Sequence, residues 1–354
     1  LTPLDAVPTP PLGTSYSPDG KYVILATDGA AVVVFDVASG KRLFRLPGSQ
    51  AERALFDVER SILYSSHNDG KVRIWDLGSG AFGRTPVGNL GEASWVRINS
   101  FSFGPDLAAF EPFDRAAFEG FVGFFDPATG ELVGERVEGQ QAVALPDGRF
   151  ALTRMPDAAQ IIYDPRSGEE QVLISCPTED FVTCSDTGDP LPFYGLRLSI
   201  DGSELAAVTT RGVATIFDPD TGSVIREERH ELDGTFLETV LFSDDWILVS
   251  TGTAYGAIDR ATGDELWRAE AFVGERELSH SRNIAAFNER GVVRIVDLEA
   301  WEDRVLEHGF GRIHGLAFSP DDQRLAVADE DRIAFIDLAS DDLIQTVPAQ
   351  NVSD

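Results

Sequence analysis

Short apolar stretches recur along the whole chain, and each is bounded by Gly, Pro, Asp or Asn. Examples are 22–26 (YVILA), 71–75 (KVRIW), 205–208 (LAAV) and 325–328 (LAVA). β-Branched and aromatic residues fill these stretches, and no convincing helical period interrupts them. The pattern therefore predicts an all-β fold of short antiparallel strands joined by tight turns.

A six-residue phrase marks the repeat: an aromatic or aliphatic residue, Asp, two variable residues, Ser or Thr, and Gly. Six copies are intact, at 35–40, 75–80, 125–130, 163–168, 217–222 and 258–263, and two are degraded, at 296–301 (VDLEAW) and 336–341 (IDLASD). Asp can accept hydrogen bonds from backbone N–H groups two or three residues on, and Gly takes the positive φ that closes a turn. Each copy therefore predicts a hairpin turn.

A second turn signal precedes the phrase in the repeat, as at 17–20 (SPDG), 200–202 (IDG) and 319–322 (SPDD). Each repeat then contains four strands, and eight repeats in 354 residues give about 44 residues each, the length of a β-propeller blade. We expect eight four-stranded blades, with seven blades and one collapsed repeat as the alternative. The expected blades are 11–47, 52–88, 97–138, 140–174, 195–230, 236–270, 275–307 and 312–348.

The segment 65–76 resembles a WD repeat, because Arg73-Ile-Trp75-Asp76 follows Ser65 and Asn68-Asp69-Gly70. A weaker resemblance covers nearly the whole chain and implies a bacterial WD-repeat-like propeller with degenerate repeats. WD repeats usually carry a Gly-His pair whose His joins a Ser, an Asp and the Trp in a buried polar network. Here that His is missing upstream of Ser65, and the Gly-His order is reversed or broken around His308 and His314. One further segment, 257–267, is similar to a quinoprotein-type blade.

We expect a single propeller domain at 11–348, followed by a tail at 349–354. The Pro-rich segment 1–10 is expected to lie along the outer edge of the last blade. The chain starts with Leu1 rather than Met, so we expect a domain cut from a longer protein or a mature fragment. It contains no secretory signal or membrane-spanning apolar run, which favours a cytoplasmic location and leaves an extracytoplasmic one open for a cut domain. Cys176 and Cys184 are either two thiols in a long connector or a local disulfide.

The charge narrows the class of partner. With 59 acidic and 29 basic residues the formal net charge is −30. Such a surface repels phosphate backbones and anionic lipid headgroups, so we expect neither nucleic acid nor membrane as a partner. Basic proteins, cationic peptides and metal ions remain.

Motifs for catalysis are missing from the sequence. It has no Gly-x-Ser-x-Gly elbow, no phosphate-binding loop, no Asp-x-Asp-x-Asp-Gly calcium loop and no His or Cys spacing of a zinc site. We therefore expect no catalytic residue, no metal and no cofactor. The alternative is a propeller hydrolase or lactonase with a central-channel site, for which the candidates would be Glu111, Asp114, Glu238 and Asp329. The acidic run 329–331 is instead expected to be a solvated turn.

Three segments are longer than a propeller needs: 84–96, 112–119 and 175–195. In a propeller, connectors between blades and loops between second and third strands share one face, to which all three segments belong. They combine aromatic residues with acidic ones, which suits an apolar and basic partner segment. We therefore expect a non-catalytic interaction or sensor module of a larger signalling or regulatory protein, monomeric as an isolated domain. The alternative is that these loops only pack on one another. The expected partner-binding residues are Trp95, Phe113, Phe118, Phe181, Phe193 and Tyr194.

Overall fold

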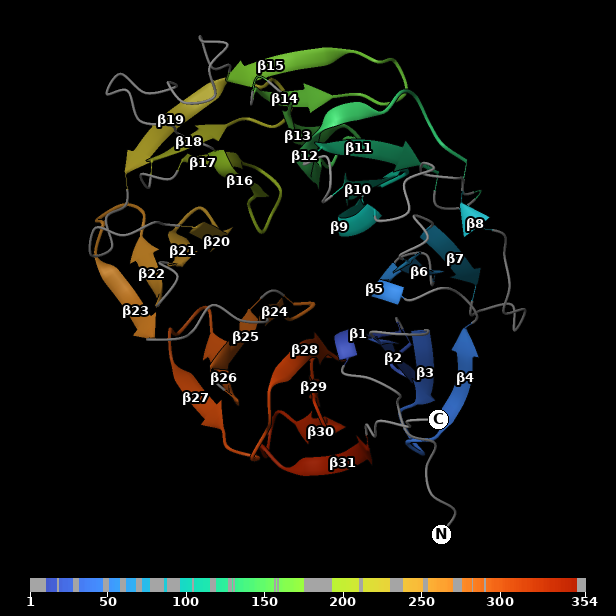
Figure 1. Cartoon of the computed structure of the whole chain (residues 1–354). Coiled ribbons are helices and arrows are strands. Elements are labelled where there is room, and N and C mark those ends of the chain that lie inside the picture. The colour runs from blue at the N-terminus through green and yellow to red at the C-terminus, as the bar shows by residue number, and fades with distance from the viewer. Residues whose placement is uncertain are drawn as a thin grey trace. The chain divides into compact units, whose positions relative to one another are not determined.

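The computed structural model describes residues 11–17, 19–27, 32–46, 51–57, 62–67, 72–76, 86–87, 96–103, 105–114, 119–126, 129, 131–155, 157, 159–174, 193–209, 213–229, 238–250, 254–269, 276–281, 283–289 and 291–348. Every regular element in these ranges is a β-strand, as the sequence predicts (Figure 1). No helix that could cross a membrane is found among them. They form two compact units, Leu1–Ile98 with Phe272–Asp354, and Asn99–Ala271.

The unit formed by the two ends of the chain contains four antiparallel sheets, each with its strands in sequence order. The first two sheets are β1 (Pro11–Tyr16), β2 (Tyr22–Thr27), β3 (Val32–Asp36) and β4 (Arg42–Leu46), then β5 (Ala51–Asp57), β6 (Ile62–His67), β7 (Val72–Asp76) and β8 (Pro86–Val87). The last two are β24 (Arg276–Leu278), β25 (Ile284–Glu289), β26 (Val292–Asp297) and β27 (Asp303–Leu306), then β28 (Ile313–Phe318), β29 (Arg324–Asp329), β30 (Arg332–Asp337) and β31 (Leu343–Pro348).

The middle unit contains one larger sheet and two four-stranded ones. The larger sheet is β9 (Val96–Phe103), β10 (Ala108–Asp114), β11 (Glu119–Phe125), β12 (Val137–Ala144), β13 (Phe150–Arg154), β14 (Gln160–Tyr163) and β15 (Glu170–Ile174). The others are β16 (Phe193–Leu198), β17 (Leu205–Thr209), β18 (Val213–Phe217) and β19 (Val224–Arg229), then β20 (Glu238–Phe242), β21 (Trp246–Ser250), β22 (Tyr255–Asp259) and β23 (Glu265–Ala269).

The larger sheet differs from the two separate blades expected at 97–138 and 140–174. The strand β12 first pairs with β11, through Val137 and Glu138, and then continues as the partner of β13. A register shift and a positive φ of 59° at Gln141 separate the two parts. In place of the fourth strand of the expected blade 97–138, one bridge forms between Leu132 and Phe125. Because one strand serves both neighbours, the described strands form six four-stranded sheets and one of seven, and eight blades remains a prediction.

Both predicted turn signals close as hydrogen-bonded turns. In the first kind, Ser199 Oγ donates to Asp201 at 2.7 Å and accepts from the backbone N–H of Glu204 at 2.9 Å. In the second kind, Asp218 accepts hydrogen bonds from the Thr221 backbone N–H at 2.7 Å and the Thr221 hydroxyl at 3.0 Å. These bonds hold the pKa of Asp218 below its ordinary value. The Asp carboxylate of the repeated phrase therefore accepts hydrogen bonds within its own turn and stabilises it.

The two degraded copies of the phrase keep the same backbone. Gly222 and Gly263, which end intact copies, have φ values of 67° and 78°. At the corresponding positions Trp301 and Asp341 have φ values of 56° and 60°, in the left-handed region that non-glycine residues rarely adopt. The turn therefore persists without its glycine, because the neighbouring strands and the Asp cap fix it.

The first and last sheets of the chain pack against each other (Figure 1, blue and red). Their shared core includes Tyr16, Val33, Phe35, Ile333 and Phe335, all buried, and the Tyr16 and Phe335 rings meet edge-on with centroids 6.2 Å apart. Each sheet has four strands of its own in sequence order, so within the described residues the two ends join by side-chain packing rather than strand exchange. The predicted edge position of 1–10 falls on residues outside the described ranges.

Neighbouring sheets are also joined by a glutamine that contacts a turn glycine. Gln171 of β15 donates to the Thr221 carbonyl at 2.6 Å, across the gap to the next sheet. A Cβ at Gly222 would overlap that side-chain amide and lie 2.9 Å from Leu173 Cδ2. The corresponding position at Gly263 is open, with no atom within 4 Å. The glycine that ends the repeated phrase therefore packs against the neighbouring sheet at Gly222, whereas at Gly263 only its backbone conformation matters.

We predict that Gly222→Ala destabilises the chain by about 1 kcal/mol more than Gly263→Ala. Both substitutions place a side chain at positive φ, which costs about 1–2 kcal/mol. Only Gly222→Ala also displaces Gln171 and breaks its hydrogen bond, which contributes about 0.5–1.5 kcal/mol. Urea unfolding of both variants measures the difference. In a Gln171→Ala background most of the excess should disappear, leaving only the close contact with Leu173. An undiminished excess there would contradict the explanation.

Candidate functional site

The structure describes the backbone of three of the six expected partner-binding residues. Phe113 lies near the end of β10, paired with Gly120 of β11, and Phe193 lies at the start of β16, paired with Thr209 of β17, with Tyr194 next to it. In a sheet with strands in sequence order, both positions lie at the end that carries the loop between the second and third strands. The side chains of these three residues, and the whole of Trp95, Phe118 and Phe181, lie outside the described parts. That the six form one binding surface therefore stays a hypothesis.

Asp329 differs from the expectation of a solvated turn at 329–331. Glu330 and Asp331 are exposed, but Asp329 is only 2% exposed. Its carboxylate accepts hydrogen bonds from the backbone N–H groups of Asp331 at 2.9 Å and Arg332 at 2.8 Å. The expectation was wrong for Asp329 because the residue ends strand β29 and caps the turn to β30. The side chains of the other three channel candidates, Glu111, Asp114 and Glu238, are outside the described parts.

One connector between sheets, 307–312, is described in full. Arg332 donates to the carbonyl of His308 at 2.7 Å, and its guanidinium lies 5.7 Å from the centroid of the buried Phe310 ring. Asp329 accepts a 3.3 Å hydrogen bond from the backbone N–H of Gly311. The connector is thus held by the turn between β29 and β30, at the end of the sheet that we expect to bind a partner.

The histidines near this connector do not form the network that WD repeats usually have. His308 Nε2 lies 2.9 Å from the carbonyl of Asp341, and His314 Nε2 is buried without a hydrogen-bond partner in the described structure. Burial and the charge of Arg312 lower the pKa of His314. In the second sheet, Trp75 Nε1 donates to Ser65 Oγ at 2.8 Å in a buried position, so this pair of the expected network is present. Asp69 lies outside the described ranges.

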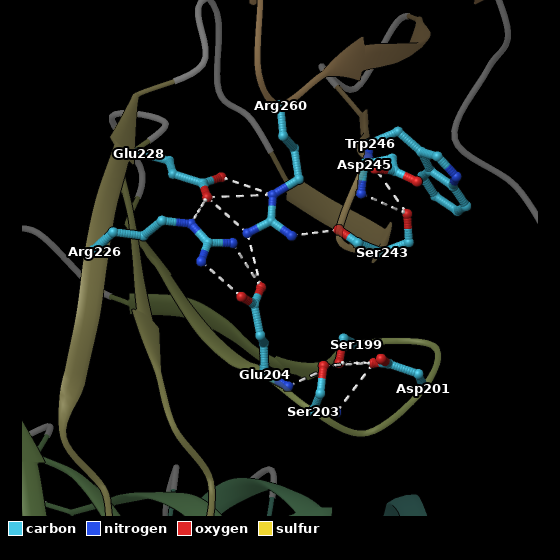
Figure 2. Close-up of polar contacts among 10 residues, drawn as sticks. All are labelled: Ser199, Asp201, Ser203, Glu204, Arg226, Glu228, Ser243, Asp245, Trp246 and Arg260. Atoms are coloured by element: carbon cyan, nitrogen blue, oxygen red, sulfur yellow. Dashed lines mark hydrogen bonds and ion pairs between the residues drawn. The ribbon is translucent and has the colours of Figure 1, made fainter.

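A cluster of four charged side chains joins two sheets of the middle unit (Figure 2). Arg260, in the turn after β22, is 4% exposed and contacts Glu204 at 2.8 Å and Glu228 at 2.6 Å. Arg226 on β19 contacts the same two carboxylates, at 2.7 and 2.5 Å. Arg260 also donates to the Ser243 carbonyl, and its guanidinium lies 5.4 Å from the Phe242 ring centroid.

This Glu204–Arg226–Glu228–Arg260 cluster is electrically balanced. The side chains of Glu204 and Glu228 are 10% and 11% exposed, so their charges need the two guanidinium groups to remain in the interior. Sequence reasoning missed the cluster because its members come from separate turns and strands. Since its charges are used in pairing, we interpret it as a structural link between sheets.

No group of three or more His, Cys, Asp or Glu residues in the described part of the chain is arranged to hold a metal ion. The two cysteines, Cys176 and Cys184, fall outside that part. The described part of the chain therefore presents three features: the loops at the ends of the sheets, the connector 307–312, and an ion cluster that links two sheets.

Three comparisons with known proteins bear on the family. Residues 303–336, from β27 through most of β30, match the family model "WD domain, G-beta repeat". The search of curated proteins gives no match. The chain is similar to the crystal structure of the computationally designed Ika8 protein, with 17% identity, 92% of this chain and 95% of that chain covered, and a TM-score of 0.65. It is also similar to the β-propeller domain of Cps50 (Swd1) from Myceliophteria thermophila, with 17% identity, 80% and 93% covered, and a TM-score of 0.56. Together with the recurring turns and sheets, these similarities show a β-propeller fold in which residues 303–336 match a WD repeat.

Proposed function

We propose that the chain is a non-catalytic interaction or sensor module of a larger bacterial signalling or regulatory protein. WD-repeat propellers are typically protein-interaction scaffolds, and the match at 303–336 supports this assignment. The module binds a basic and apolar protein segment through the face that carries the connectors and the loops between second and third strands. We call this the connector-loop face, with Trp95, Phe113, Phe118, Phe181, Phe193 and Tyr194 as its anchors.

The difference between the two ends of the sheets is the observation that carries this proposal. At one end, turns such as 199–204 and 218–222 are short, and their Ser, Thr and Asp side chains are bonded to their own backbone. At the other end the chain has room for long segments, such as 175–192 between β15 and β16. Binding residues in proteins concentrate in loops positioned by a rigid scaffold. The connector-loop face is therefore the better surface for recognition.

The charge of the chain supports a basic partner. The net charge is −30, and acidic residues flank the aromatic ones in all three long segments. Aromatic anchors surrounded by like charges favour a partner that inserts apolar groups and presents opposite charge around them. Encounter with such a partner should be faster at low salt, because surface charges are screened within about 8–10 Å at 0.1–0.15 M.

We predict that the double variant Phe113→Ala, Phe118→Ala binds partners at least about tenfold more weakly, as expected for the loss of anchor residues. The probe is a peptide selected from a random library on the full chain, and the readout is titration calorimetry. Thermal stability should change by about 1 kcal/mol or less, as for surface positions.

The matched control is Leu266→Ala, which removes a large apolar side chain that is 39% exposed on β23, away from the long segments. It should leave peptide binding unchanged. A large loss of stability in the double phenylalanine variant would instead place those rings in the core. Association rates that do not change between low and high salt would contradict the electrostatic part.

A further inference from the structure

A pocket of about 490 Å³ lies in the middle unit, and none of the six proposed anchors lines it. It lies between the segment 134–138, which leads into β12, and residues 154–155 and 163–168 around β13 and β14. Gln171 contacts the turn glycine of the next sheet at Gly222, but the Cβ position of Gly168 has no atom within 4 Å. The pocket lies beside the segment that takes the place of a fourth strand in the expected blade 97–138, where one bridge forms between Leu132 and Phe125.

The three arginines that line the pocket are already engaged. Arg154 forms ion pairs with Asp157 at 2.5 Å and with Glu170. Arg166 pairs with Asp106 at 3.1 Å, and the Arg136 guanidinium lies 4.8 Å from the Phe121 ring centroid. The charges of Arg154 and Arg166 are therefore compensated by carboxylates, and the Arg136 guanidinium faces an aromatic ring.

Two acidic groups and one hydroxyl of the lining lack such partners. Glu135 and Glu138 are exposed, and their carboxylates form no hydrogen bond or ion pair with any residue that the structure describes. Tyr163 is only 6% exposed, yet it lines the pocket and its hydroxyl has no hydrogen-bond partner among the same residues. The hydroxyl oxygen itself is not enclosed by the protein, so it is open to a group that enters the pocket.

The electrostatic environment of Tyr163 agrees with a negative pocket. Burial raises the pKa of its phenol, and the charges of Glu135, Asp164 and Glu170 raise it further. The ring of Tyr163 also offers an apolar wall beside Met155 and Val137. The pocket thus combines uncompensated carboxylates, one unbonded hydroxyl and an apolar wall.

We propose that this pocket binds an arginine or lysine side chain of a partner protein. The aliphatic stem packs against the apolar wall, and the cationic head donates hydrogen bonds to Glu135, Glu138 and the Tyr163 hydroxyl. A cation suits all three groups, since carboxylates accept only and the phenol oxygen can accept as well. This second contact uses none of the six proposed anchors of the connector-loop face.

Met155 makes the proposal directly testable, because it is the only methionine of the sequence and it lines the pocket. The full chain is labelled with ¹³C at the methionine methyl and titrated with the peptide acetyl-Leu-Arg-Leu-amide. We expect a saturable shift of the Met155 methyl signal. The matching peptide with citrulline, which keeps the shape and removes the charge, should bind at least about tenfold more weakly.

The double variant Glu135→Gln, Glu138→Gln should raise the dissociation constant of the arginine peptide about tenfold or more. Tyr163→Phe should raise it about threefold. The control is Glu227→Gln, Asp264→Asn, which removes two exposed acidic groups of the same unit outside the pocket and changes the net charge equally. It should change the dissociation constant by less than about twofold.

Three results would overturn the proposal. If the citrulline peptide bound as tightly as the arginine peptide, the pocket would not require a cationic ligand. An equal loss in the control variant would mean long-range attraction only. Tighter binding of agmatine, which carries the guanidinium without a peptide backbone, would assign the pocket to a free small cation instead of a partner protein.

Discussion

Arg260→Ala should lower the free energy of unfolding by about 3–5 kcal/mol, a large effect for one side chain. The substitution removes the more buried of the two guanidinium groups that contact Glu204 and Glu228, whose side chains are 10% and 11% exposed. Removing one member of a buried ion pair is costly because the remaining charge stays desolvated without compensation. The contact between the guanidinium and the Phe242 ring is lost as well. Urea unfolding followed by tryptophan fluorescence measures the change.

Arg226→Ala is the matched control for this prediction. Arg226 contacts the same two carboxylates, but its side chain is 37% exposed, so water can replace much of what it provides. Its removal should cost clearly less than that of Arg260, about 1–2 kcal/mol, because water reaches the position that its guanidinium leaves. Adding Glu204→Gln and Glu228→Gln to Arg260→Ala should recover part of the lost stability, since neutral amides are cheaper to bury. Equal costs for Arg260→Ala and Arg226→Ala would contradict the proposed role of burial.

Local turn chemistry made most of the fold predictable. The phrase at 217–222 ends β18 and begins the turn to β19, and the phrase at 35–40 likewise lies between β3 and β4. These signals act over a few residues, so the sequence displays them directly. The irregular strand β12 could not be predicted in the same way. The strand bends at Gln141, which has a positive φ. No residue type marks this bend in the sequence, because it results from the pairing of β12 with both β11 and β13.

The charged cluster and the pocket could not be predicted because both depend on contacts distant in sequence. Arg260 and Glu204 are 56 residues apart and meet only because their sheets pack together. The burial of Asp329 has a local signal, since an Asp at a strand end can cap the turn that follows, but its acidic neighbours suggested a solvated run. The aromatic anchors of the connector-loop face were inferred from segment length and composition, and they remain a proposal.

Replacement of the long connector 175–192 should abolish partner binding while the sheets stay folded. The segment carries one anchor, Phe181, and joins the flanking anchors Phe193 and Tyr194 to β15. The connector 307–312 makes the same kind of connection, from the fourth strand of one sheet to the first of the next, and can serve as the substitute. A shorter surface connector changes loop-closure entropy little, so stability should be nearly unchanged.

The control replaces 230–237, between β19 and β20, with the same substitute. This connector carries none of the six proposed anchors, so binding should persist. Comparing the two variants separates the loss of specific anchors from the general effect of shortening a connector.

The most direct test of the connector-loop face is the dissociation constant of a library-selected peptide for the 175–192 replacement variant, measured by calorimetry beside its thermal unfolding. We predict an unfolding temperature close to that of the parent chain and no measurable peptide binding. A variant that folds normally and still binds the peptide with the affinity of the parent chain would contradict the assignment and place the site elsewhere.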